Sequence, residues 1–258
     1  MSHRCRRHRY ITAVLFAGLL LIGGGSTLLQ SGRVAGNAFP WTCAAVLALS
    51  ILTWRVRCAF AKESGNLPDA FFPGLANQLT VFRGLLICLL AGFLVLVPQE
   101  GLLAWMPGSL YSMALIMDGF DGYLARLRKE TTIFGVFLDR DLDALETLIG
   151  ILLAVHYSRL PNWCMLAGIS YYLFSFGEWW RARRGLPLYP LPESRYRRYA
   201  AVVQSIFIAF ALLPVSVLPE FDMAAALVMI PVLAGFLRDW RIVAGYDRRG
   251  LAGGPRLL

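Results

Sequence analysis

The side chains best suited to chemistry in this chain are aspartates inside two neighbouring apolar runs. Asp118 and Asp121 belong to the segment MDGFDGYLAR, and Asp139 and Asp143 belong to GVFLDRDLD. An aspartate at the centre of a membrane helix costs roughly 2.5–3.5 kcal/mol on insertion scales, so four of them would together cost on the order of 10 kcal/mol. We therefore expect a compensating ligand to bind among these carboxylates.

The spacing of the aspartates predicts two acidic stripes that face each other. Asp118 and Asp121 are three residues apart and Asp139 and Asp143 are four apart, so each pair shares a helix face. The short connection at 127–132 makes the two helices antiparallel neighbours. At 1.5 Å per residue, Asp118 and Asp139 both lie roughly 10–12 Å from that connection. Facing carboxylates of this kind are ligands that Mg²⁺ prefers, together with substrate phosphates and water.

Two simpler interpretations of the acidic cluster stay open at this point. The acids either pair with nearby arginines or bind a transported cation. The nearby arginines are Arg126, Arg128 and Arg140. Asp143 has no obvious cationic partner in its own segment. Asp141 is turned about 200° from the acidic stripe at 100° per residue, so we expect it to stand off the site and to pair with Arg140 or another neighbour.

Long apolar helices must position these acids. The chain of 258 residues is 57% hydrophobic and 16% charged, whereas soluble domains average about 25% charge. Eight apolar runs have the length that a hydrocarbon core of about 30 Å requires. They lie at residues 11–29, 40–60, 76–97, 104–125, 132–156, 161–180, 199–217 and 222–243. The composition therefore predicts an all-α polytopic membrane protein with about eight transmembrane helices.

The net charge of +9 is explained by membrane orientation, so no nucleic-acid partner is expected. Basic segments precede the first run and follow the second, fourth, sixth and eighth runs, which places all of them on one side. The positive-inside rule then puts both termini in the cytoplasm. We expect an integral protein of a bacterial cytoplasmic (inner) membrane. A signal peptide remains an alternative for the first run, because Gly36 and Ala38 provide small residues near a cleavage position.

Residues 118–143 read D-x2-D-G-x2-A-R-x8-G-x3-D-x3-D. This pattern resembles the signature of the CDP-alcohol phosphatidyltransferase family. Upstream, Asn77-x2-Thr80-x2-Arg83 is similar to the N-x-x-T-x-x-R element that precedes the signature in many members. The resemblance implies a six-helix catalytic core of that family type.

The resemblance also implies how the chain is divided. Residues 1–62 would form an added N-terminal pair of transmembrane helices. Residues 63–247 would form the catalytic membrane domain, whose first segment, 63–75, lies along the interface. Residues 248–258 would form a cytoplasmic tail.

The family resemblance assigns expected roles to the signature residues. It implies that Asp118, Asp121, Asp139 and Asp143 ligate two divalent ions, Mg²⁺ or Mn²⁺, and that Asp143 is also the general base. The residues implied to hold the CDP moiety are Asn77, Thr80, Asp118, Gly122, Ala125 and Arg126. The implied reaction moves a phosphatidyl group from a CDP-linked lipid, such as CDP-diacylglycerol, to an alcohol and releases CMP, as in phospholipid biosynthesis.

The acceptor alcohol stays open, because the residues after Asp143 match no acceptor-specific pattern. The candidate acceptor contacts are Glu146, Arg195, Arg197 and Arg198. The basic residues among them also fit plain orientation charge. A homodimer is one option for the assembly.

Two other functions compete with lipid transfer. A membrane prenyltransferase also uses aspartates and Mg²⁺, but it normally needs a second acidic cluster, and the later half offers only the scattered Asp222, Asp239 and Asp247. A divalent-cation transporter would use the acids as an ion path, but it has no need for the small residues Gly122 and Ala125.

Overall fold

The computed structural model describes residues 3–31, 38–62, 75–98, 100–128, 133–192, 194–215 and 221–246. Within these ranges the protein is built from eight long α-helices. They are α1 (His3–Ser31), α2 (Ala38–Lys62), α3 (Leu75–Gly92), α4 (Met106–Arg128), α5 (Ile133–His156), α6 (Met165–Arg183), α7 (Arg195–Leu212) and α8 (Phe221–Val243). Short 3-10 turns lie at Phe93–Val95, Gly101–Trp105 and Asn162–Cys164. The predicted all-α class is confirmed.

Four of the described helices, α1, α2, α3 and α8, are long and apolar enough to cross a membrane. The others carry charged residues within or at the end of an apolar stretch, including the aspartates of α4 and α5. Among the four apolar helices α3 lies deepest in the protein, since 67% of its span at 77–95 is buried, against 17% for α1 and 22% for α8. The central helix is therefore α3, which lies next to α4 and α5.

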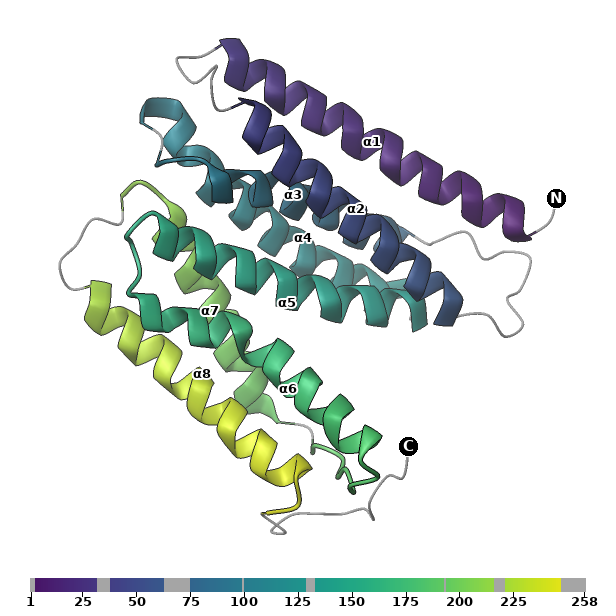
Figure 1. The fold of residues 1–258 in the computed structure, drawn as a ribbon, viewed down its shortest axis with the longest axis vertical. Coiled ribbons are helices and arrows are strands. Elements are labelled where there is room, and N and C mark those ends of the chain that lie inside the picture. Colours follow the sequence, from purple (N-terminus) through teal and green to yellow (C-terminus); the bar gives the residue numbers. More distant parts are fainter. Residues whose placement is uncertain are drawn as a thin grey trace.

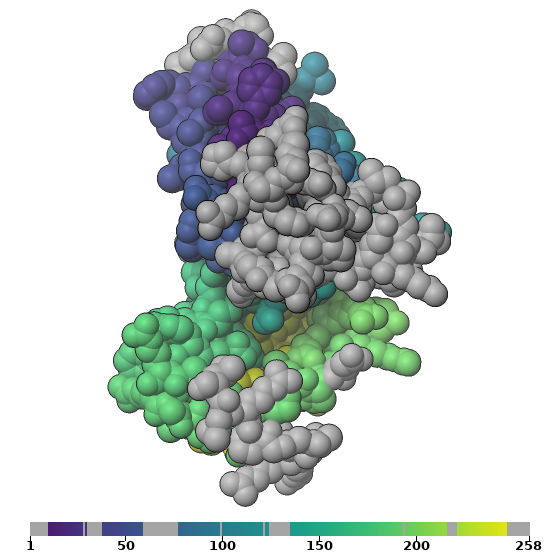
Figure 2. All heavy atoms as spheres, turned by 90° about the vertical axis from the view of Figure 1, so that its right-hand side faces the viewer, coloured from purple at the N-terminus to yellow at the C-terminus, as the bar shows by residue number. Residues whose placement is uncertain are grey.

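The helices follow one another across the molecule. In Figure 1, α1 and α2 form an antiparallel pair at one end, α3, α4 and α5 lie in the middle, and α6, α7 and α8 lie at the other end. Figure 2 shows the same order from the side, with the N-terminal helices at the top and the later helices below. Most of the predicted interfacial segment, residues 63–74, and the predicted tail, residues 248–258, lie outside the described residues.

A small residue lets α5 pack closely in the middle of this bundle. A Cβ atom on Gly150 would lie 2.4 Å from the ring of Tyr111 on α4 and 2.6 Å from Ile208 on α7. Tyr111 and Ile208 are both fully buried. The close contact of α4, α5 and α7 at this level is therefore possible only because glycine, which has no Cβ atom, occupies position 150.

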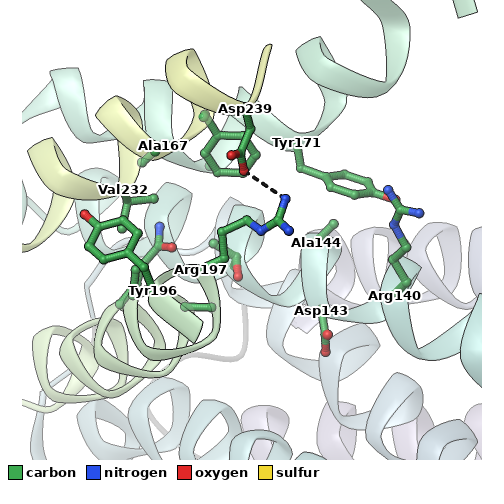
Figure 3. A pocket seen from close by; sticks show the side chains of 16 residues that line it. Arg140, Asp143, Ala144, Ala167, Tyr171, Tyr196, Arg197, Val232 and Asp239 are labelled. Carbon is green, nitrogen blue, oxygen red and sulfur yellow. Dashed lines mark hydrogen bonds and ion pairs between the residues drawn. The ribbon is translucent and has the colours of Figure 1, made fainter. Parts of the chain in front are cut away.

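The middle of α5 borders a pocket. Its volume is about 290 Å³, and its walls come from α5, α6, α7 and α8 (Figure 3). Small side chains, such as Ala167, Gly168, Ala200 and Gly235, form much of the lining. Close to this pocket, α5 also carries the predicted acidic stripe, so this helix links the two parts of the candidate site.

Candidate active site

The predicted carboxylates gather around the buried guanidinium of Arg83. Arg83 lies on α3, and its side chain is 0% exposed. Its Nη1 pairs with Asp118 of α4. Its Nη2 lies 3.1 Å from Oδ1 of Asp139 and 2.9 Å from Oδ1 of Asp143, both on α5. One cation from α3 therefore joins Asp118 of α4 to the acidic stripe of α5, so these three of the four predicted aspartates converge.

Glu146 belongs to the same cluster. Its Oε2 lies 3.9 Å from Nε of Arg83, and its side chain is 6% exposed. We predicted Glu146 as a candidate acceptor contact, but it faces Arg83 and does not line the pocket. Four carboxylates, with a formal charge of −4, thus surround one guanidinium of charge +1. The described cluster carries three negative charges in excess.

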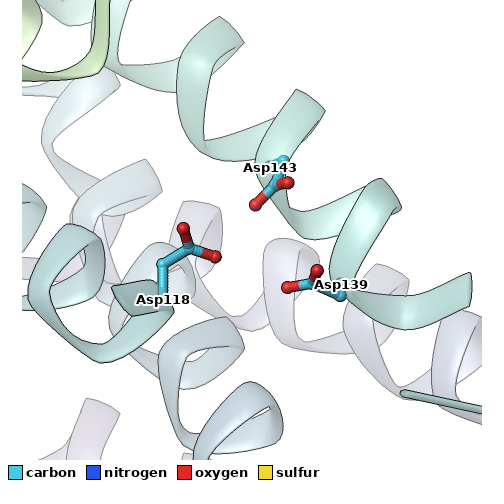
Figure 4. Close-up of side chains that lie close together, drawn as sticks. All are labelled: Asp118, Asp139 and Asp143. Atoms are coloured by element: carbon cyan, nitrogen blue, oxygen red, sulfur yellow. The ribbon is translucent and has the colours of Figure 1, made fainter. Parts of the chain in front are cut away.

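The aspartates of this cluster fit a divalent cation. Asp118, Asp139 and Asp143 each offer a carboxylate oxygen, and these oxygens lie within 4.8 Å of one another. Figure 4 shows the three side chains converging from α4 and α5. Hard oxygen donors with an excess of negative charge suit Mg²⁺ or Mn²⁺. The geometry therefore allows the metal site that the sequence predicts.

Three other predicted residues lie on α4 without a described side chain. They are Asp121, Ala125 and Arg126. Gly122, which lies among them, is half-buried. The expected metal role of Asp121 and the expected CDP contacts of Ala125 and Arg126 remain predictions.

Asn77 and Thr80 lie on the first two turns of α3. Each is 4% exposed. With Arg83 they are spaced three residues apart, so the three side chains form one buried polar stripe on a largely apolar helix. This stripe leads from the start of α3 to the acidic cluster. The expected CDP contacts of Asn77 and Thr80 remain predictions.

The central role of Arg83 was not predicted from the sequence, because the cations closest in sequence to the acids lie on α4 and α5. Arg140, one of those cations, forms no ion pair with a described residue; its guanidinium lies 5.6 Å from the ring centre of Tyr171. The available signal was the position of Arg83, the only charged residue in α3. An arginine inside an apolar helix requires a counter-charge.

Asp141 stands off the cluster, as its angular position predicted. It pairs with Arg55 of α2 through Nη2 and Oδ2. We predicted that Asp141 pairs with Arg140 or another neighbour. Its partner is Arg55, which is a neighbour in space but lies 86 positions earlier in the sequence.

Asp143 also lines the pocket beside α5. The pocket is also lined by Arg140 and Thr147 of α5, Tyr171 of α6 and Arg197 of α7. Arg197 donates from Nη1 to Oδ2 of Asp239 on α8 at 3.1 Å, the dashed line in Figure 3.

Asp239, the partner of Arg197, is one of the scattered acids in the later half of the chain. Of the predicted acceptor residues, Arg197 therefore lines the pocket, whereas Arg195 and Arg198 are exposed on the first turn of α7 and do not line it. Arg140 was not predicted as a pocket residue. Its position three residues before Asp143 was the available signal, because that spacing puts both side chains on one face of α5.

Known proteins resemble parts of this chain. The profile of the CDP-alcohol phosphatidyltransferase family matches residues 74–238. A CDP-diacylglycerol–glycerol-3-phosphate 3-phosphatidyltransferase of Cereibacter sphaeroides is 37% identical over 62 residues, which are 24% of this chain and 28% of that protein. An enzyme of the same name from Wigglesworthia glossinidia brevipalpis is 37% identical over 78 residues, which are 27% of this chain and 43% of that protein. The chain thus spans less than half the length of these relatives. No solved structure matches it.

Proposed function

The chain belongs to the CDP-alcohol phosphatidyltransferase family, and from this premise we propose that it transfers a phosphatidyl group from a CDP-linked lipid to an alcohol and releases CMP. The two relatives are named for this type of transfer, from CDP-diacylglycerol to glycerol 3-phosphate. The proposed product is a phosphodiester lipid, and the proposed place of the enzyme is phospholipid biosynthesis.

The observation that carries the proposal is the position of Asp143 at the junction of cluster and pocket. Its Oδ1 lies 2.9 Å from Arg83, and its side chain also lines the pocket. It is 55% exposed, more than Asp118 at 37% and Asp139 at 41%. Asp143 therefore lies between the cluster, where we place the nucleotide pyrophosphate, and the pocket, where we place the alcohol.

The proposed mechanism uses Asp143 as the base. It takes the proton of the acceptor hydroxyl, while the hydroxyl oxygen forms a bond to the lipid-side phosphorus of the CDP-lipid. The bond from this phosphorus to the bridging oxygen breaks, and CMP leaves with the electron pair. A carboxylate is a weak base for an alcohol, so proton transfer runs late. Divalent cations, when bound, neutralise the pyrophosphate and the charge that develops on the leaving group.

The remaining site residues hold the substrates in place. Asp118, Asp121, Asp139 and Asp143 are the proposed ligands of two Mg²⁺ or Mn²⁺ ions. The converging oxygens of Asp118, Asp139 and Asp143 support this proposal. The proposed CDP contacts are Asn77, Thr80, Asp118, Gly122, Ala125 and Arg126. Arg126 suits a phosphate through its planar donor fork.

We assign the acceptor to the pocket and expect it to be phosphorylated. Arg197 is already neutralised by Asp239, whereas Arg140 pairs with no described carboxylate. Arg140 and Asp143 are three residues apart on one helix face, so their Cβ atoms are separated by about 5–6 Å. In the proposed arrangement the hydroxyl of a small phosphorylated alcohol lies at Asp143 and its phosphate at Arg140, whose guanidinium lies beside Tyr171.

A second acidic cluster, as a prenyltransferase would need, is not found among the described residues. They contain one group of three or more potential metal ligands, the group of Asp118. In the later half Asp239 is engaged by Arg197. The described acids therefore favour lipid transfer over prenyl transfer.

The topology and division of the chain belong to the same proposal. We place both termini in the cytoplasm of a bacterium, with the catalytic domain at 63–247 and the added helix pair at 1–62. The basic residues at the start of α7 and the end of α6 then lie on the cytoplasmic side. Labelling of single cysteines from one side of sealed vesicles tests this orientation.

CMP release by the purified protein tests the function. CDP-diacylglycerol is offered with a panel of alcohols, both phosphorylated and unphosphorylated. We expect CMP and a new phospholipid with a phosphorylated alcohol. If CDP-lipid binds and no alcohol yields CMP, the proposal is wrong. Mn²⁺ or Mg²⁺ flux into liposomes without any nucleotide would instead indicate a transporter.

A further inference from the structure

The second helix, α2, lies outside the part of the chain that matches the family, yet it contacts the helix that carries the proposed base. Arg55 of α2 pairs with Asp141 of α5. The carbon of its guanidinium also lies 5.2 Å from the ring centre of Phe137, one turn earlier on α5. Two consecutive turns of α5 thus contact a single side chain of α2.

This contact lies on the face of α5 opposite the acidic cluster. Asp141 is two residues from both Asp139 and Asp143, which turns its side chain by about 200° at 100° per residue. Arg83 holds the cluster face of α5, and Arg55 holds the opposite face. A rotation of α5 about its axis would break both sets of ion pairs, so together they fix its orientation.

Apolar packing supports the same contact behind Arg83. Leu52 lies on α2, three residues before Arg55, and is 1% exposed. A Cβ atom on Gly84, the residue after Arg83, would lie 2.8 Å from Cδ1 of Leu52 and 3.4 Å from Cδ2 of Leu142 on α5. The α2 helix therefore packs against the junction of α3 and α5 directly behind the cluster.

We propose that α2 positions the acidic face of α5, and that Arg55 is the positioning residue through its pair with Asp141. The pair is largely withdrawn from solvent, with side chains 32% and 15% exposed. Removing either partner leaves a poorly solvated charge, which moves toward another partner or toward water. The inference rests on the proposed function only in taking the carboxylates as a divalent-cation site.

Mn²⁺ binding to the full-length protein in detergent, measured by electron paramagnetic resonance without substrate, tests the inference. Arg55→Met and Asp141→Asn should weaken Mn²⁺ affinity about 10–100-fold, the range found for residues that orient metal ligands. Arg55→Lys and the exchanged pair Arg55→Asp with Asp141→Arg should recover most of that affinity. Arg57→Met, an exposed site on the same helix, is the matched control and should bind as the wild type does.

The outcomes separate positioning from simple support of the fold. Variants that melt at lower temperature but keep wild-type Mn²⁺ affinity overturn the inference, and so does a wild type without Mn²⁺ affinity. If Arg55→Met does not fold, Asp141→Asn and the exchanged pair decide, because each keeps a polar or charged partner at the contact. A wild type that binds Mn²⁺ but releases no CMP counts against the proposed function alone.

Discussion

Replacing Arg83 with glutamine tests how the acidic cluster is held together. The Arg83 side chain is 0% exposed and faces four carboxylates. Removing one partner of a buried ion pair typically costs about 3–5 kcal/mol, because the other charge is left uncompensated. The aspartates of the cluster are 37%, 41% and 55% exposed, so solvent screens part of their repulsion. We therefore expect the free energy of unfolding in chelator to fall by about 3 kcal/mol.

Mn²⁺ should restore much of the free energy of unfolding that the Arg83→Gln variant loses. A ligand at 100 times its Kd stabilises the folded state by about 2.7 kcal/mol, so the unfolding free energy of the Arg83→Gln variant should rise by that amount at such a concentration. The assay is reversible chemical unfolding in detergent, first with chelator and then with Mn²⁺. Arg57→Gln, an exposed arginine of α2, is the control. An Arg83→Gln protein that unfolds in chelator at the wild-type free energy refutes the reasoning.

Three further substitutions probe other parts of the site and fold. Asp143→Asn should keep CDP-lipid binding in a filter assay but abolish CMP release, and near-normal turnover would remove its role as base. Arg140→Gln should raise the KM for a phosphorylated acceptor at least tenfold, since a charged hydrogen bond contributes about 1.5–3 kcal/mol; an equal change with an unphosphorylated alcohol would argue against phosphate binding. Gly150→Ala should destabilise the protein by about 1–3 kcal/mol, because its new Cβ would overpack the core, and an unchanged melting temperature would contradict the close contact with Tyr111.

The positions of the helices were predictable because the hydropathy of each segment and the turn residues that flank it depend on the local sequence alone. The predicted run at 222–243 corresponds to α8 (Phe221–Val243) almost residue for residue. The run predicted from 161 begins as an α-helix only at Met165, because a 3-10 turn occupies Asn162–Cys164. The run predicted to 97 ends as an α-helix at Gly92 and continues as the 3-10 turn Phe93–Val95. Such ends depend on local hydrogen bonding that apolar periodicity does not encode.

The carboxylates of the site were also predictable, because their cost inside an apolar run is visible in the sequence alone. Their partners were not. Arg83 precedes Asp139 by 56 positions and Arg55 precedes Asp141 by 86, so each pair depends on which helices become neighbours. The places of the predicted acceptor residues also depend on which helices become neighbours. Because α7 packs against α8, Arg197 pairs with Asp239, whereas Arg195 and Arg198 are exposed.

The divalent-cation dependence of CMP release tests the central claim most directly. The claim is that the aspartates gathered around Arg83 bind the cations that phosphatidyl transfer requires. With CDP-diacylglycerol and glycerol 3-phosphate as substrates, the wild type should release CMP in proportion to bound Mn²⁺ or Mg²⁺ and should stop in chelator, and Asp118→Ala should stay inactive at cation concentrations that saturate the wild type. CMP release that survives chelator, or that Asp118→Ala retains in full, would contradict the account.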